Sequence, residues 1–134
     1  MCWSKRRRSR AANHSGGSSA AAVATGLVGA SVGDSEARRF GVGPPVCLTR
    51  DQLRRPLLGS GFAMPIGFKH ETAGDGVLIV ALDGLWKYAK LDRVAAVLKS
   101  EPAEAARALV ELVRYPGGSL PDDVATAVCR ITRR

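Results

Sequence analysis

The stretch GVLIVALD, residues 76–83, constrains the fold more than any other part of the chain. Its first seven residues carry no charge, and the run VLIV contains only branched aliphatic side chains, which is typical of a strand buried on both faces. Asp83 follows directly, and Gly84 then permits a tight turn. A carboxylate at the end of a buried strand is rigidly held, which suits a metal ligand. The alternative is that Asp83 only caps an ordinary Asp-Gly turn.

The composition predicts one globular domain with a basic leader. The chain has 134 residues, of which 46% are hydrophobic and 24% charged. Its formal net charge is +8, but five positive charges lie within the first ten residues. We therefore predict a basic, disordered leader over residues 1–16 and one folded domain over residues 17–134. No signature of a nucleic-acid-binding fold follows the leader, which argues against nucleic acid as the main partner.

Cysteine usage and hydropathy indicate the compartment. Cys2, Cys47 and Cys129 form no CxxC pair, and their number is odd, which favours reduced thiols in a cytoplasmic protein over a zinc site or a disulfide framework. Cys129 is expected to be a small core residue. No apolar run is long enough to cross a membrane, so no membrane partner is predicted. The arginines and the Ala-rich stretch after them also resemble an export signal, but glycines interrupt its apolar part.

Short apolar runs before the central stretch predict strands. We expect them at residues 18–25, 27–32, 37–40 and 46–49. The first two are expected to form a hairpin with its turn at Gly26, and the third to lie at a sheet edge. Residues 50–74 are rich in glycine and proline and have no sustained period, which predicts a long loop packed down by its apolar residues. His70 is expected to be an ordinary residue of this loop.

The remainder of the chain predicts two helices and a closing strand. Apolar residues recur at helical spacing over residues 91–99 and 101–114. Residues 124–131 are expected to form a strand beside the central one. Trp86 and Tyr88 are expected to cover one end of the core.

Four segments resemble the motifs of one family. VLIVALDGLWKYA is similar to the signature LASDGLWD, and SGGSSAAAVATGLVGASVGDSEA is similar to a strand pair containing GSTA and VGDSRA. CLTRDQ resembles LTxDH, and PDDVATAVCRI resembles the closing strand DNITVVVV. These are motifs of the protein phosphatase 2C family, the PPM-type metal-dependent Ser/Thr protein phosphatases. The resemblance extends roughly over residues 16–132.

This resemblance implies a fold and a chemistry. The implied fold is α+β, a partial phosphatase 2C-type sandwich of mostly antiparallel strands with two helices packed on one face. The chain would correspond to the carboxy-terminal half of the catalytic domain. Asp83 and Asp122 would bind Mg²⁺ or Mn²⁺, and Asp34 would help to bind a further ion. The implied substrates are phosphoserine and phosphothreonine in proteins, attacked by a metal-activated water.

Several departures from the family pattern leave the function open. The family's first half, with its bridging DGHGG aspartate and its phosphate-binding arginine, has no counterpart in this sequence. Lys87 stands where many relatives have an aspartate, Leu82 replaces a small residue, and Gln52 replaces a histidine. One interpretation is a truncated phosphatase that is inactive without an amino-terminal half and is marginally stable or self-associating. The alternatives are a non-catalytic phosphatase-like binding or regulatory module and an unrelated basic binding module.

Overall fold

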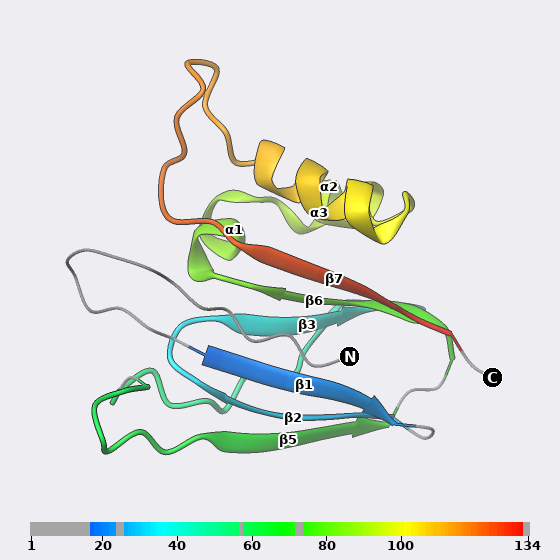
Figure 1. Cartoon of the computed structure of the whole chain (residues 1–134). Helices are drawn as coiled ribbons and strands as arrows, with labels where there is room; N and C mark the ends of the chain where they lie inside the picture. The colour runs from blue at the N-terminus through cyan, green and yellow to red at the C-terminus, as the bar shows by residue number, and fades with distance from the viewer. Residues whose placement is uncertain (1–16, 24–25, 57, 72–73, 133–134) are drawn as a thin grey trace.

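The chain folds into two stacked antiparallel sheets with helices over one outer face (Figure 1). The structure, a computed structural model, describes residues 17–23, 26–56, 58–71 and 74–132. The predicted leader therefore lies outside the described residues. Among those described, no helix is both long and apolar enough to span a membrane.

Each sheet has a simple strand order. The first sheet has the order β1-β2-β5, formed by β1 (Gly17–Val23), β2 (Gly26–Val32) and β5 (Ile66–Glu71). The second has the order β4-β3-β6-β7, formed by β4 (Val46–Cys47), β3 (Glu36–Phe40), β6 (Gly76–Ala81) and β7 (Thr126–Ile131). The helices are α1 (Asp83–Tyr88), α2 (Leu91–Val97) and α3 (Pro102–Glu111), and they cover the second sheet. These layers confirm the expected α+β sandwich.

The central strand β6 is covered on both faces, as its sequence predicts. Ile79 and Ala81 face the helices and are fully or nearly fully buried, whereas Leu78 faces the first sheet, where it packs with Leu27. This alternation follows from the period of two residues along a strand. β7 pairs with β6 along its whole length, from Gly76 opposite Ile131 to Ala81 opposite Thr126. The predicted neighbourhood of the two strands is confirmed.

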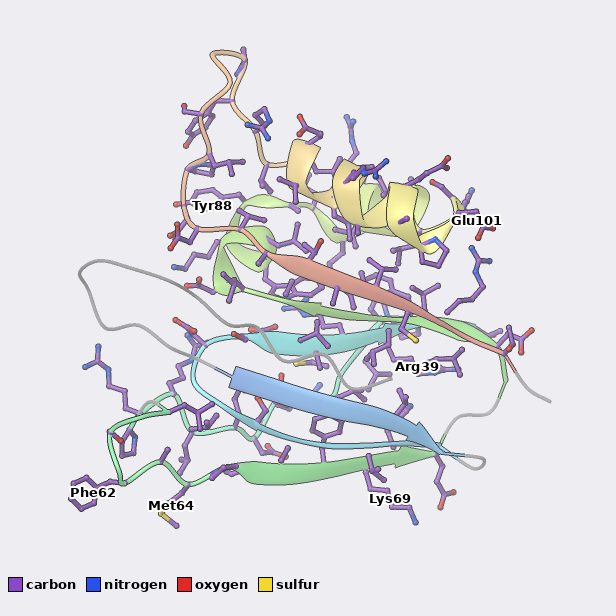
Figure 2. The ribbon with its side chains drawn as sticks, in the orientation of Figure 1. Arg39, Phe62, Met64, Lys69, Tyr88 and Glu101 are labelled. Carbon is purple, nitrogen blue, oxygen red and sulfur yellow. The ribbon has the colours of Figure 1, made fainter. Side chains whose placement is uncertain are left out.

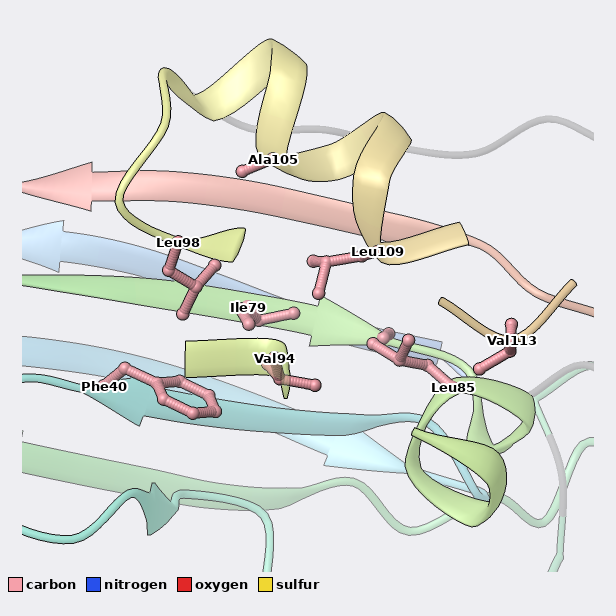
Figure 3. Packing of buried hydrophobic residues seen from close by; sticks show 9 residues of the cluster. Phe40, Ile79, Leu85, Val94, Leu98, Ala105, Leu109 and Val113 are labelled. Atoms are coloured by element: carbon pink, nitrogen blue, oxygen red, sulfur yellow. The ribbon is translucent and has the colours of Figure 1, made fainter. Parts of the chain in front are cut away.

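The larger core lies between the second sheet and the helices (Figure 3). Its buried members on the helices include Leu85, Val94, Ala105 and Leu109. Ala105 and Leu109 lie one turn apart on α3, so they form the apolar stripe that the sequence predicts. Trp86 packs against this core as expected. Tyr88 does not, because its side chain is about half exposed at the end of α1 (Figure 2).

The prediction of a loop over residues 50–74 is wrong in part. Residues Ile66–Glu71 form β5, which pairs with β2, and His70 lies opposite Leu27 in this ladder. The segment IGFKHE was missed because it alternates only weakly and contains glycine. Nor is the preceding loop packed down, since Phe62 and Met64 project into solvent (Figure 2).

Other local predictions also need correction. Gly26 is the first residue of β2 and not a turn residue, and a Cβ at this position would lie 2.5 Å from the carbonyl oxygen of His70. Glycine is therefore required where β5 approaches β2. β3 is an inner strand and not the predicted edge strand, because β6 pairs with it on one side and the short strand β4 pairs with it on the other. Cys129 is exposed on β7 and is not a core residue.

Candidate metal centre

Asp83 is the first residue of the short helix α1, which follows the central strand after a single residue. The sequence predicted a turn at this position, so α1 was missed. Leu82 between them is extended, and its amide donates to the carbonyl of Ala125, 3.1 Å away. The amide of Leu85 donates back to the carbonyl of Leu82. The carboxylate of Asp83 is therefore mounted on a backbone that is tied to the segment preceding β7.

Gly84 allows that segment to approach α1 closely. A Cβ at position 84 would lie 2.5 Å from the carbonyl oxygen of Asp123 and 3.1 Å from the Cβ of Asp122. Real Cβ atoms do not approach a backbone oxygen so closely, so only glycine fits without movement. The DG dipeptide thus has two roles: Asp83 supplies a carboxylate, and Gly84 admits the loop that carries Asp122.

Asp83 and Asp122 converge on the ammonium group of Lys87. The Nζ atom lies 2.5 Å from Oδ2 of Asp83 and 3.4 Å from Oδ2 of Asp122. Lys87 and Asp83 are four residues apart on α1 and share one side of the helix. The hydrogen bond with Asp83, and to a lesser extent that with Asp122, raises the pKa of Lys87.

The carboxylate of Asp122 is oriented by its own backbone. The amide of Asp123 donates to its Oδ1 atom at 2.8 Å, while Oδ2 faces Lys87. This backbone hydrogen bond is the largest influence that lowers the pKa of Asp122, and Lys87 lowers it further. One oxygen of the Asp122 carboxylate therefore accepts from the backbone and the other from the lysine ammonium, and both contacts favour the charged form.

Asp34 lies at the same end of the sandwich but apart from this pair. It follows β2 and precedes β3, whose first residue, Glu36, pairs with Ala81 at the end of β6. Gln52 ties down this turn, because its side chain binds the hydroxyl of Ser31 and donates to the carbonyl of Ser35 at 2.9 Å. Within the described part of the chain, no three His, Cys, Asp or Glu side chains are grouped so that they could hold a metal ion. The structure brings Asp83 and Asp122 together and does not add Asp34 to them.

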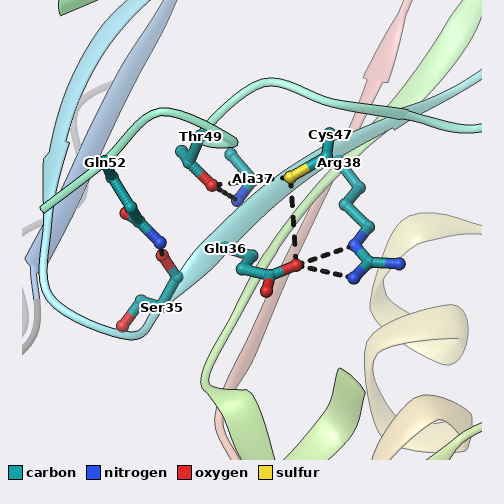
Figure 4. A network of polar contacts seen from close by, with 7 residues as sticks. All are labelled: Ser35, Glu36, Ala37, Arg38, Cys47, Thr49 and Gln52. Carbon is teal, nitrogen blue, oxygen red and sulfur yellow. Dashed lines mark hydrogen bonds and ion pairs between the residues drawn. The ribbon is translucent and has the colours of Figure 1, made fainter. Parts of the chain in front are cut away.

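A polar network missed by the sequence analysis surrounds the start of β3 and includes the ion pair of Glu36 with Arg38 (Figure 4). The guanidinium group of Arg38 donates to Oε2 of Glu36 at 2.9 and 2.6 Å and lies over the ring of Trp86, 4.4 Å from its centroid. Glu36 and Arg38 are two residues apart, so they share a strand face, and Trp86 lies on α1. Opposite charges spaced by two residues in a strand were the available signal. The contact of Arg38 with Trp86 joins this network to the helix that carries Asp83 and Lys87.

The two converging carboxylates suit a hard divalent ion. Mg²⁺ and Mn²⁺ prefer carboxylate oxygens and keep several bound waters, so one or two protein carboxylates can suffice for an ion. Asp83 and Asp122 already lie around one positive group of Lys87. They are of the chemical kind that a divalent ion prefers and lie around one position, which the ammonium group of Lys87 occupies.

Comparison with solved structures identifies the fold. The chain matches PppA, described as a key regulatory component of T6SS in Pseudomonas aeruginosa, with a TM-score of 0.69 and 20% identity over 85% of this chain. It matches the catalytic domain of the serine/threonine protein phosphatase PstP, solved with two manganese ions, with a TM-score of 0.67 and 21% identity over 83%. The PPM Ser-Thr phosphatase MsPP from Mycobacterium smegmatis, solved with cacodylate, gives a TM-score of 0.65 and 24% identity over 83%.

The fold is therefore that of part of a PPM-type phosphatase domain. The chain covers 56%, 56% and 59% of the lengths of these three structures. No protein-family model matches the sequence, and no curated protein does. At these identities the likeness establishes the fold, which agrees with the resemblance carried by the sequence motifs.

Proposed function

We propose that this chain forms part of a metal-dependent protein serine/threonine phosphatase and supplies Asp83 and Asp122 as metal ligands. The observation that carries the proposal is the convergence of these two carboxylates, from α1 and from the loop before β7, on a single cationic group. The fold supports it, because PstP and MsPP are Ser/Thr phosphatases and PstP was solved with manganese. The proposed substrates are phosphoserine and phosphothreonine in proteins.

In this proposal the chain's own residues position the reacting groups. Asp83 and Asp122 hold Mg²⁺ or Mn²⁺, which when bound lowers the pKa of a coordinated water and attracts the phosphoryl oxygens. Gly84 keeps the two carboxylates close, and the amide of Asp123 keeps Asp122 in one orientation. Asp34, at the same end of the sandwich, is the weaker candidate for a further ion.

Two carboxylates are too few for a two-metal phosphatase site. The described residues bring no third ligand to Asp83 and Asp122. We infer that the remaining ligands and a cation for the phosphate come from outside these residues, as an amino-terminal half of the domain would supply. Each lost electrostatic contact of this kind typically costs about 2.7–4 kcal/mol of transition-state stabilisation. Residues 17–132 by themselves are therefore expected to turn over substrate at close to the background rate.

The second candidate is a non-catalytic phosphatase-like binding or regulatory module. The observation that favours it is Lys87, which already neutralises part of the charge of both aspartates. PppA, described as a regulatory component, shows the same fold. In either case Cys47 and Cys129 are free thiols, which suits a reducing compartment such as the cytoplasm.

Hydrolysis assays separate the two candidates. The chain is assayed with phosphoserine and phosphothreonine peptides and Mn²⁺, alone and together with the amino-terminal half of a PPM-type domain. The phosphatase proposal predicts background turnover alone and metal-dependent turnover in the mixture, abolished by Asp83→Ala or Asp122→Ala. Asp92→Ala, an exposed change on α2, is the control and should keep the activity. Failure of the mixture to hydrolyse either peptide would favour the regulatory module.

A further inference from the structure

We propose that Lys87 is a tethered counter-ion of the Asp83–Asp122 pair, which a divalent ion must displace before it binds. This inference rests on the proposed metal role of the two aspartates and adds a means by which metal binding is regulated.

The close approach of the two aspartates creates a need for a cation. Asp83 is held by the backbone that joins β6 to α1, and Asp122 by the loop packed against Gly84. These contacts hold the backbones that carry the two carboxylates close to each other. Two carboxylates held near each other repel, and a positive group between them removes the repulsion.

Lys87 supplies this positive group from within the chain. It contacts both carboxylates, although Asp122 lies 35 residues further along the sequence. An isolated surface ion pair contributes little, but here one ammonium joins two separate elements, α1 and the loop before β7. Lys87 therefore offsets the repulsion between the two aspartates from within the chain.

Lys87 is also able to leave. Its side chain is 53% exposed and ends on a flexible four-carbon stem, so the ammonium can swing into solvent while α1 stays in place. A divalent ion gains both carboxylates only after this movement. Lys87 thus lowers the affinity of the site for metal and makes occupancy depend on anything that draws the ammonium away, such as an anionic phosphate.

Manganese binding by the full 134-residue chain tests this inference. Free Mn²⁺ is measured by electron paramagnetic resonance during titration of the wild type, Lys87→Met and Lys99→Met. Methionine keeps the approximate length and apolar stem of lysine and removes the charge, and Lys99 is an exposed lysine just after α2. Removing a competing unit charge at this distance should tighten Mn²⁺ binding at least about tenfold in Lys87→Met. Lys99→Met should bind like the wild type.

Thermal unfolding supplies a second measurement. In EDTA, Lys87→Met should melt below the wild type, because its acidic pair has lost the counter-ion. Added Mn²⁺ should raise the melting temperature of Lys87→Met toward that of the wild type. The wild type should respond less to Mn²⁺. If Lys87→Gln behaves like Lys87→Met, the lost charge and not the methionine side chain is responsible.

The possible outcomes separate this inference from the proposed function. Equal Mn²⁺ affinity in the wild type and Lys87→Met, with binding lost in Asp83→Asn, overturns the counter-ion role and leaves the aspartates as ligands. Weaker binding in Lys87→Met overturns it as well. If none of the proteins binds Mn²⁺, the displacement of Lys87 in this chain is overturned, and the metal role of Asp83 and Asp122 is then decided by the hydrolysis assay with the amino-terminal half.

Discussion

The backbones of Gly84 and Asp123 meet so closely that a Cβ on the glycine would lie 2.5 Å from the aspartate's carbonyl oxygen. This contact joins the first turn of α1 to the loop before β7. It brings Asp122 within reach of the side chains on α1, so the acidic pair depends on the absence of a side chain at position 84.

Gly84→Ala should therefore loosen the loop. The added methyl group pushes residues 121–125 away from α1, and we expect a loss of about 1–3 kcal/mol in the free energy of unfolding. Urea denaturation measures this loss. Gly117→Ala is the matched control, because a Cβ at that position has no atom within 4 Å and should change the stability by less than about 0.5 kcal/mol. Equal stabilities of the two variants would contradict the close contact.

Ile79 provides a test of the larger core. Its side chain is fully buried in the middle of β6, between the sheet and the helices. Ile79→Ala leaves a cavity at this point, so we expect unfolding to become easier by about 2–5 kcal/mol, measured by the shift of the denaturation midpoint. Val42→Ala, at a fully exposed position, should have almost no effect. A small loss at Ile79 would mean that the helices do not pack on this sheet.

The contact of Arg38 with Trp86 can be followed by fluorescence. Arg38→Met removes the charge over the indole ring and the ion pair with Glu36, which is mostly shielded from solvent. We expect a loss of about 1 kcal/mol in stability and a changed emission of Trp86. Lys69→Met is the control, because its ion pair with Glu71 is long and exposed. An unchanged emission spectrum in Arg38→Met would rule out the stacked arrangement.

The Asp122 carboxylate should make stability depend on acid. The amide of Asp123 and the ammonium of Lys87 lower the pKa of Asp122 in the folded chain. A lowered carboxyl pKa means that its charged form stabilises the fold above the unfolded value of about 4 and that this contribution disappears as the pH falls through the folded value. The wild type should therefore melt above Asp122→Asn at pH 7, and the difference should shrink below about pH 4.

The contribution of Lys87 to stability should depend on pH in the opposite sense, and at alkaline pH. Its pKa is raised, so its contribution is fully present below the ordinary lysine value and is lost as the pH rises through the raised one. Melting temperatures of the wild type and Lys87→Met should converge at strongly alkaline pH and differ at neutral pH. For the Asp122 prediction, the contradicting result is a difference in melting temperature between the wild type and Asp122→Asn that grows as the pH falls.

Some of this architecture could be predicted from local sequence. The uncharged run of β6 and the helical spacing of Ala105 and Leu109 on α3 are local signals, because burial on both faces or on one stripe selects residue types at fixed intervals. The motifs around Asp83 and Asp122 likewise identified two candidate metal ligands, although no local pattern shows that the two side chains lie close together. β5 and α1 were missed, because IGFKHE and DGLWKY are too short and too mixed in polarity to show a clear period.

The sequence by itself determined the central strand, the helix over it and the identity of the acidic residues. The tertiary structure alone decided which charges meet: Lys87 lies between Asp83 and Asp122, whereas Asp34 stands apart from them. The physical reason is that strand and helix periods are set by neighbours within a few residues. Contact between positions 87 and 122 depends instead on strand register and on the space left at Gly84, which only the packed chain defines.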